Sequence, residues 1–154
     1  MEFIQTIPKT DLARKTRQVL QAVQRGQTTI VESHGQPEAA IIDIIDYRIL
    51  RAILHYYSHR PEVNPDVELS GDSFATIEDP QDQFNLVLAY YLGQVISMGR
   101  CAELLDLPYI DLRMRFARLD VPVFVGPQNI EELEAELENV ERWENEHNQS
   151  GSSR

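Results

Sequence analysis

The chain has 154 residues, the size of one ordinary domain or two small ones. Apolar residues make up 42% of it, enough for a core, and no run approaches the roughly 18 apolar residues that a membrane span needs. The net charge of −11 is unevenly divided: residues 1–60 hold eight Lys or Arg against six Asp or Glu, and residues 61–154 hold six against nineteen. Parts of opposite sign suggest a different partner for each.

The cysteine content and the first residues bear on location. The single Cys101 excludes an internal disulfide framework and favours a reducing compartment. Residues 1–5 lack the basic and apolar regions of a signal peptide. We therefore expect a cytoplasmic protein with no membrane partner.

The first 26 residues predict a strand followed by a helix. Residues 3–7 are β-like and end at Pro8, and a helix with one apolar stripe then runs to Gly26. Such a helix can contact phosphates through its opposite side, although a solvated surface accounts for that side equally well. The residues on that side are Arg14, Arg17, Gln18, Gln21 and Arg25, with no acid among them.

Residues 28–43 predict a β-hairpin that turns at His34-Gly35, because glycine accepts the positive φ of a tight turn. Both strands are apolar on both faces, since neighbouring apolar residues in a strand point to opposite sides. The chain's own helices can cover one face, and we expect a second copy of the chain to cover the other. The expected dimer interface consists of Ile30, Val31, Ile41 and Ile42.

A second helix follows the hairpin and ends at Arg60-Pro61. It carries His55 and His59 at a spacing that a metal ion can use, but no Cys or carboxylate on that face completes a ligand set. We expect helix-end polar residues here, and neither a metal nor another cofactor.

The order of elements in residues 1–60 carries a resemblance to a known family. A strand is followed by a basic helix that ends in Arg25-Gly26, then by a hairpin and a second helix. The core of the hairpin is His34-Gly35-Gln36-Pro37-Glu38-Ala39. Residues 1–60 resemble the Phd/YefM-type antitoxins. The resemblance implies a small α+β domain that dimerises through its sheet and binds operator DNA to repress a toxin–antitoxin operon. We expect a three-stranded antiparallel sheet with two helices, followed by a mainly helical C-terminal module. The resemblance implies DNA contacts from Lys9, Thr10, Arg14, Lys15, Arg17 and Arg25.

Residues 61–80 are acidic and interrupted by prolines, which is typical of a linker. Residues 81–127 predict a small module of helices, with Ser97 as an N-cap and Pro108 at the start of a helix over 109–118. Residues 93–107 and the helix after them resemble a family of small prokaryotic helical proteins that are considered antitoxin-like and occur beside PIN-domain toxins. This resemblance implies a PIN-type ribonuclease as the toxin.

The helices on either side of Pro108 also allow a helix-turn-helix interpretation, in which the second helix reads DNA. We favour packing against the core or a partner, because the turn lacks a glycine and the second helix is apolar on two sides. An ion pair between Asp111 and Arg115 would account for both residues. The arginines in question are Arg113, Arg115 and Arg118.

Residues 128–147 predict an acidic amphipathic helix, and residues 148–154 a disordered tail. The helix can dock on the helical module or pair in a short coiled coil. Alternatively, its apolar stripe can bind a groove on a toxin, with the carboxylates facing a basic surface. The expected toxin-binding residues are Ile130, Leu133, Leu137, Val140 and Trp143.

No phosphate-binding glycine loop, zinc motif, nucleophile elbow or Cys-x-x-Cys occurs, so we expect no catalytic residues and no enzyme. The leading hypothesis is the antitoxin of a type II toxin–antitoxin system, a homodimer or higher oligomer that binds operator DNA and a cognate toxin. The alternatives are a dimeric scaffold that touches no DNA and a stand-alone transcription regulator without a toxin.

Overall fold

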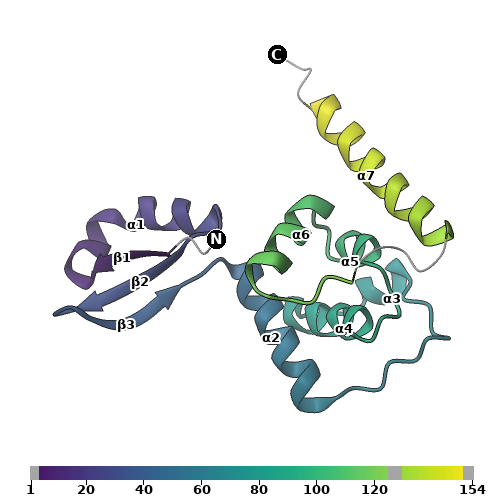
Figure 1. Cartoon of the computed structure of the whole chain (residues 1–154), viewed down its shortest axis with the longest axis horizontal. Coiled ribbons are helices and arrows are strands. Elements are labelled where there is room, and N and C mark those ends of the chain that lie inside the picture. The colour runs from purple at the N-terminus through teal and green to yellow at the C-terminus, as the bar shows by residue number, and fades with distance from the viewer. Residues whose placement is uncertain (1–3, 125–129, 151–154) are drawn as a thin grey trace. The chain divides into compact units, whose positions relative to one another are not determined.

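The computed structural model describes residues 4–124 and 130–150, and in the second range the side chains of 134, 135 and 137–146 (Figure 1). It is an α+β structure, with three strands and seven helices in the described residues. The chain divides into two compact units, Met1–Arg48 and Ile49–Arg154. The division falls inside helix α2 (Ile44–His59), which begins in the first unit and ends in the second.

The sheet of the first unit is mixed, so the expected antiparallel sheet is wrong. Strand β1 (Ile4–Pro8) pairs in parallel with β2 (Thr28–Ser33), which pairs antiparallel with β3 (Gln36–Ile41). The reason is the 16-residue helix α1 (Lys9–Gln24), which lies between β1 and β2 in the chain. A helical crossover returns the chain to the end of the sheet where it started, and the second strand then runs parallel to the first.

Residues with a left-handed backbone conformation end α1 and form the turn of the hairpin. Gly26 has a φ of 95° and ends the helix, donating its N–H to the carbonyl of Val23 at 3.0 Å. The expected hairpin is present, and both of its turn residues, His34 and Gly35, have positive φ. Two positive φ values define the primed turn whose twist matches that of the flanking strands.

One face of the sheet packs against α1 (Figure 1). The apolar stripe of α1 that the sequence predicts supplies Val19 and Val23, and β1 and β2 supply Ile7 and Val31. These four side chains are buried, with Leu12 and Ile41 packed partly buried against them. This core is small, as expected for fewer than 50 residues.

The second unit is helical, as the sequence predicts. After the last part of α2 come α3 (Gly71–Ala75), α4 (Pro80–Leu92), α5 (Met98–Leu104), α6 (Tyr109–Arg118) and α7 (Ile130–Ser150). The predicted N-cap at Ser97 is confirmed, because its hydroxyl accepts the N–H of Arg100 at 3.1 Å. The helix α7 runs to Ser150, and the rest of the expected tail, 151–154, lies outside the described residues.

Tyr91 is the centre of the core of the second unit. Its ring lies 5.1 Å from that of Phe116, and both side chains are almost fully buried. The Tyr91 hydroxyl donates to the carbonyl of Pro122 at 2.8 Å and lies 3.4 Å from the backbone N of Phe124. One aromatic side chain thus joins α4, α6 and the extended segment after α6.

The acidic segment that the sequence predicts as a linker is attached to this core. Leu69 is buried, and its carbonyl accepts a 2.7 Å hydrogen bond from the guanidinium of Arg100 on α5. The side-chain amide of Gln83 on α4 donates to the carbonyl of Ile77 at 2.6 Å. These bonds fix residues 69–77 on the helical module.

Replacing Phe116 by alanine should lower the free energy of unfolding by about 3–5 kcal/mol, because it leaves a cavity beside Tyr91. Met114→Ala is the matched control: this side chain is 61% exposed on the same helix, and its removal should cost at most about 0.5 kcal/mol. Urea unfolding followed by circular dichroism measures both. Equal losses for the two variants would contradict the described packing of α6.

Candidate nucleic-acid and partner interfaces

The candidate DNA-contacting residues all lie on α1 or directly after it. The side chains of Lys9, Thr10, Arg14, Lys15, Arg17 and Arg25 are exposed. Arg14, Arg17 and Arg25 point outward because Val19 and Val23, on the opposite side of the helix, are buried against the sheet. Lys9 and Lys15 lie at the edges of the buried stripe. The basic face that the sequence predicts is therefore a surface of the first unit.

Acidic neighbours occupy part of this face. Asp11 lies 2.7 Å from the guanidinium of Arg14 and 3.9 Å from the Lys15 ammonium, and Glu38 on β3 lies 3.2 Å from Lys9. The Asp11 pairs were missed from the sequence, although their three- and four-residue spacings on a helix predict them. All three pairs are exposed, and such ion pairs contribute about 0–1 kcal/mol each, so a phosphate can replace the carboxylate.

Arg17 and Arg25 differ from these three cations. In the part of the chain that the structure describes, neither forms an ion pair. They are eight residues apart, or roughly 12 Å along a helix. Their guanidinium groups provide the uncompensated positive charge of the basic face.

The sheet has one covered and one open face. Every second residue of β2 points toward α1, and Thr29 and Val31 are two of these. The hydroxyl of the buried Thr29 accepts a 2.7 Å hydrogen bond from the side-chain amide of Gln5. The opposite face presents Ile4 and Ile30, and Ile4 is 52% exposed. Figure 1 shows no element of the first unit over this second face.

The four candidate dimer residues are therefore divided between the two faces. Val31 is buried beneath α1, and Ile41 packs against the same core. Ile30 is half-buried on the open face, opposite the exposed Ala40 of β3. Ile42 is half-buried and follows the last residue of β3. Only the side chains of the open face can contact a second chain without unfolding the first.

The candidate toxin-binding residues lie on α7. The side chains of Ile130 and Leu133 are outside the described residues. Leu137 is 54% exposed, whereas Val140 and Trp143 are half-buried. The helix packs on α5, so its C-terminal half contacts the helical module and Leu137 remains accessible.

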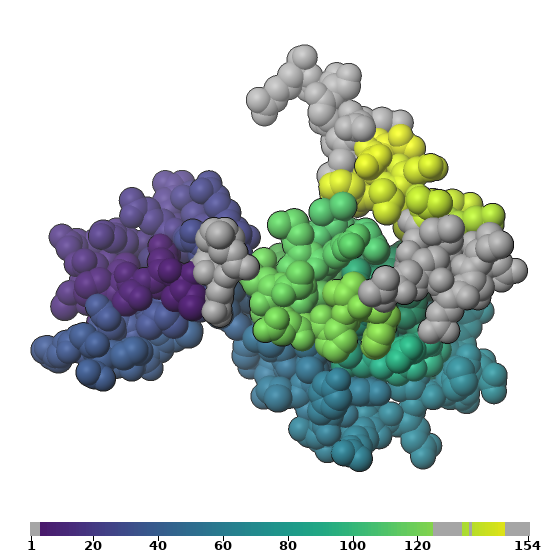
Figure 2. Space-filling view, in the orientation of Figure 1, coloured from purple at the N-terminus to yellow at the C-terminus, as the bar shows by residue number. Residues whose placement is uncertain are grey.

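The second unit exposes two apolar surfaces; the sequence indicated the one on α6, and the one on α2 was missed. Leu54 and Tyr57 on α2 are 63% and 58% exposed, and Ile110 and Met114 on α6 are similarly exposed. Figure 2 shows α6, in green, at the surface of this unit. The pattern available in the sequence was the second apolar side of α6, opposite the buried Leu112 and Phe116. Exposed apolar patches of this kind are typical of protein–protein contacts.

The arginines of α6 have a structural explanation. Arg115 lies 2.9 Å from Asp111, and its side chain is only 12% exposed, so the predicted ion pair is confirmed. Arg113 is exposed on the same helix. The buried arginine side chain supports packing as the role of this segment.

The described residues offer no group of three or more His, Cys, Asp or Glu side chains that could hold a metal ion. His55 and His59 stack with ring centroids 4.3 Å apart, and His59 Nδ1 lies 3.1 Å from the carbonyl oxygen of His55. Cys101 is fully buried, and burial raises the pKa of its thiol, which makes it an unreactive core residue.

Comparisons with known proteins give no match: no family model matches the chain, and no curated protein or solved structure is significantly similar to it. Within the described residues, no helix is both long enough and apolar enough to cross a membrane.

Proposed function

We propose that the protein is the antitoxin of a type II toxin–antitoxin system, which binds operator DNA as a dimer and neutralises a cognate toxin through its second unit. The observation that supports this most is the combination, in one small unit, of an exposed basic helix and an uncovered apolar sheet face. The resemblance of residues 1–60 to the Phd/YefM-type antitoxins agrees with both features. A cytoplasmic location is part of this proposal.

The basic face of α1 supports the DNA-binding part of the proposal. Its cations are exposed side chains, which suit contacts to phosphates more than contacts to base edges. Arg17 and Arg25 would contribute most, because among the described residues they carry no ion pair that DNA has to break. The overall charge of −11 is concentrated in residues 61–154 and does not oppose a phosphate at α1.

The open sheet face supports the dimer. Ile4, Ile30 and Ala40 lie on this face beside Thr6 and Thr28, and no described element of their own unit covers it. A two-fold dimer uses the same patch on both chains and carries two copies of α1, as a two-fold operator requires. In this proposal Ile30 is the centre of the interface, and Val31 and Ile41 support it from beneath.

The second unit supports the toxin-binding part. Its α7 is acidic, with Leu137 exposed among glutamates, and α2 and α6 add exposed apolar side chains. A toxin that cuts RNA has a basic surface, which acidic side chains can cover. A PIN-type ribonuclease is the toxin that the resemblance of residues 93–107 implies.

One observation favours a different function, a dimeric scaffold that touches no DNA. Asp11 and Glu38 already pair three of the cations on the basic face. A stand-alone regulator without a toxin is the third possibility, and the neighbouring reading frame distinguishes it, since a small basic ribonuclease-like product there supports the antitoxin.

The salt dependence of DNA binding tests the role of α1. With the DNA upstream of the protein's own gene, Arg17→Ala and Arg25→Ala should each lower the slope of log K against log salt concentration by about one, because each removes one phosphate contact. Arg113→Ala, an exposed arginine on α6, is the matched control and should leave the slope unchanged. Unchanged slopes in all three variants would remove α1 from the interface and favour the scaffold.

Sedimentation of the full chain tests the open sheet face. Ile30→Asp should convert dimers to monomers, because it places a charge in the proposed apolar interface. Leu20→Asp, which alters a 49% exposed leucine on α1, is the control and should remain dimeric. Circular dichroism checks that both variants are folded. A dimer that persists in folded Ile30→Asp protein would contradict the proposed interface.

A further inference from the structure

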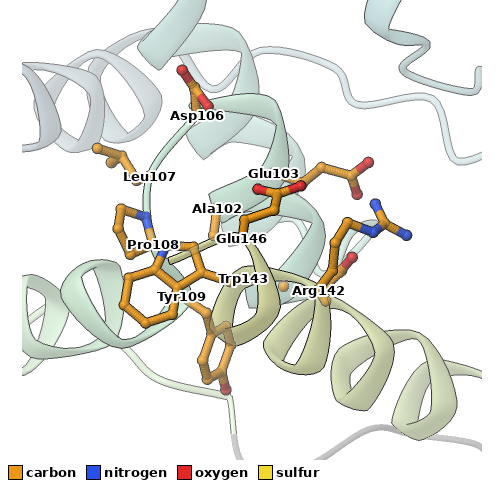
Figure 3. Close-up of a pocket in the computed structure, with 11 residues that line it drawn as sticks. Ala102, Glu103, Asp106, Leu107, Pro108, Tyr109, Arg142, Trp143 and Glu146 are labelled. Carbon is orange, nitrogen blue, oxygen red and sulfur yellow. The ribbon is translucent and has the colours of Figure 1, made fainter. Parts of the chain in front are cut away.

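A pocket of about 410 Å³ lies where α7 packs on the corner between α5 and α6 (Figure 3). This volume is within the range of sites that hold small molecules or a partner's side chain. Residues from α5, from the turn after it, from the start of α6 and from one stretch of α7 line the pocket. It lies entirely within the second unit.

One wall of the pocket is aromatic and apolar. Trp143 comes from α7, and Pro108 and Tyr109 from the start of α6. Figure 3 shows the Trp143 indole beside Pro108, with Tyr109 next to it. All three side chains are half-buried, so part of each is accessible from the pocket. The faces of tryptophan and tyrosine rings carry partial negative charge and attract cations.

The rest of the pocket carries mainly negative charge. Carboxylates come from three places in the chain: Glu103 on α5, Asp106 in the turn and Glu146 on α7. Asp106 has a φ of 54°, and its N–H donates to the carbonyl of Glu103 at 3.2 Å, which fixes the turn. Arg142 is the one cation among the lining residues that the structure describes. Arg100, outside the lining, pairs with Glu103 at 3.0 Å.

We propose that this pocket binds a cationic side chain, arginine or lysine, of a basic protein partner. A guanidinium group can stack on an indole while its N–H groups donate to carboxylates at the rim. One arginine side chain can therefore contact the aromatic wall and the carboxylates at the same time. The carboxylates disfavour a phosphate group, and a nucleic acid is therefore a poor occupant. The identification of the partner as a toxin rests on the proposed function, whereas the chemistry of the pocket does not.

The proposal gives the C-terminal part of α7 a specific role. Asn139, Arg142, Trp143 and Glu146 lie within about two helical turns, so one short docked stretch of α7 supplies one side of the pocket. The other side belongs to α5, α6 and the turn between them. Trp143 thus serves twice, as a contact that holds α7 in place and as a surface for the ligand.

Trp143 is the single tryptophan of the chain, so its indole N–H signal in ¹H–¹⁵N NMR spectra of the full-length protein reports on this pocket alone. The probe is the neutralised-terminus peptide acetyl-Gly-Arg-Gly-amide, compared with the same peptide carrying lysine, glutamine or glutamate at the centre. We expect saturable shifts with the arginine and lysine peptides, and at least tenfold weaker binding of the other two.

Asp106→Asn and Glu146→Gln should each weaken binding of the arginine peptide at least threefold. Glu144→Gln is the matched control: it alters an exposed glutamate of α7 outside the pocket lining and should leave the affinity unchanged. Equal binding of arginine and glutamine peptides, tighter binding of the glutamate peptide, or unchanged affinity in both pocket variants would each overturn the proposal.

These experiments need no toxin and no DNA. A failure of the peptide to bind leaves DNA binding by α1 and toxin neutralisation to be measured separately, and a failure of either of those leaves the peptide result standing. The two proposals are therefore tested independently.

Discussion

The parallel pairing of β1 with β2 determines how the first unit can act. It requires a crossover, and α1 is that crossover, so α1 lies on one face of the sheet. Val19 and Val23 face the sheet, and the basic residues therefore face outward. On the other sheet face, no described element of the first unit covers Ile4 and Ile30. The proposed DNA contacts and the proposed dimer both follow from this one arrangement.

The second unit depends on aromatic packing in the same way. Tyr91 contacts Phe116 and binds the segment after α6 through its hydroxyl group, so the α5–α6 corner is fixed in place. That corner is the surface on which α7 packs, and Trp143 reaches it. The acidic helix consequently contacts the module through the stretch that contains Trp143, and Leu137, six residues earlier, is exposed. Partner binding by this unit can use the pocket, the exposed residues of α7, or both.

Local signals in the sequence predicted much of this fold. The turn at His34-Gly35, the N-cap at Ser97 and the pair Asp111–Arg115 depend on near neighbours in the chain, and all are present. The direction of β1 was mispredicted, although the expected order of strand, helix and strand is that of a helical crossover, which pairs its two strands in parallel. The sequence also did not show which face of the sheet Val31 occupies. It did not reveal the pocket either, because the walls of the pocket come from residues about 40 positions apart.

The central claim is that the open sheet face pairs two chains and that DNA binding depends on this pairing. Its most direct test is the affinity of the folded, monomeric Ile30→Asp protein for the DNA upstream of its own gene, measured at one fixed salt concentration. The account predicts at least tenfold weaker binding than for the unaltered chain, although α1 and its arginines are unchanged. Equal affinity in a protein shown by sedimentation to be monomeric would contradict it.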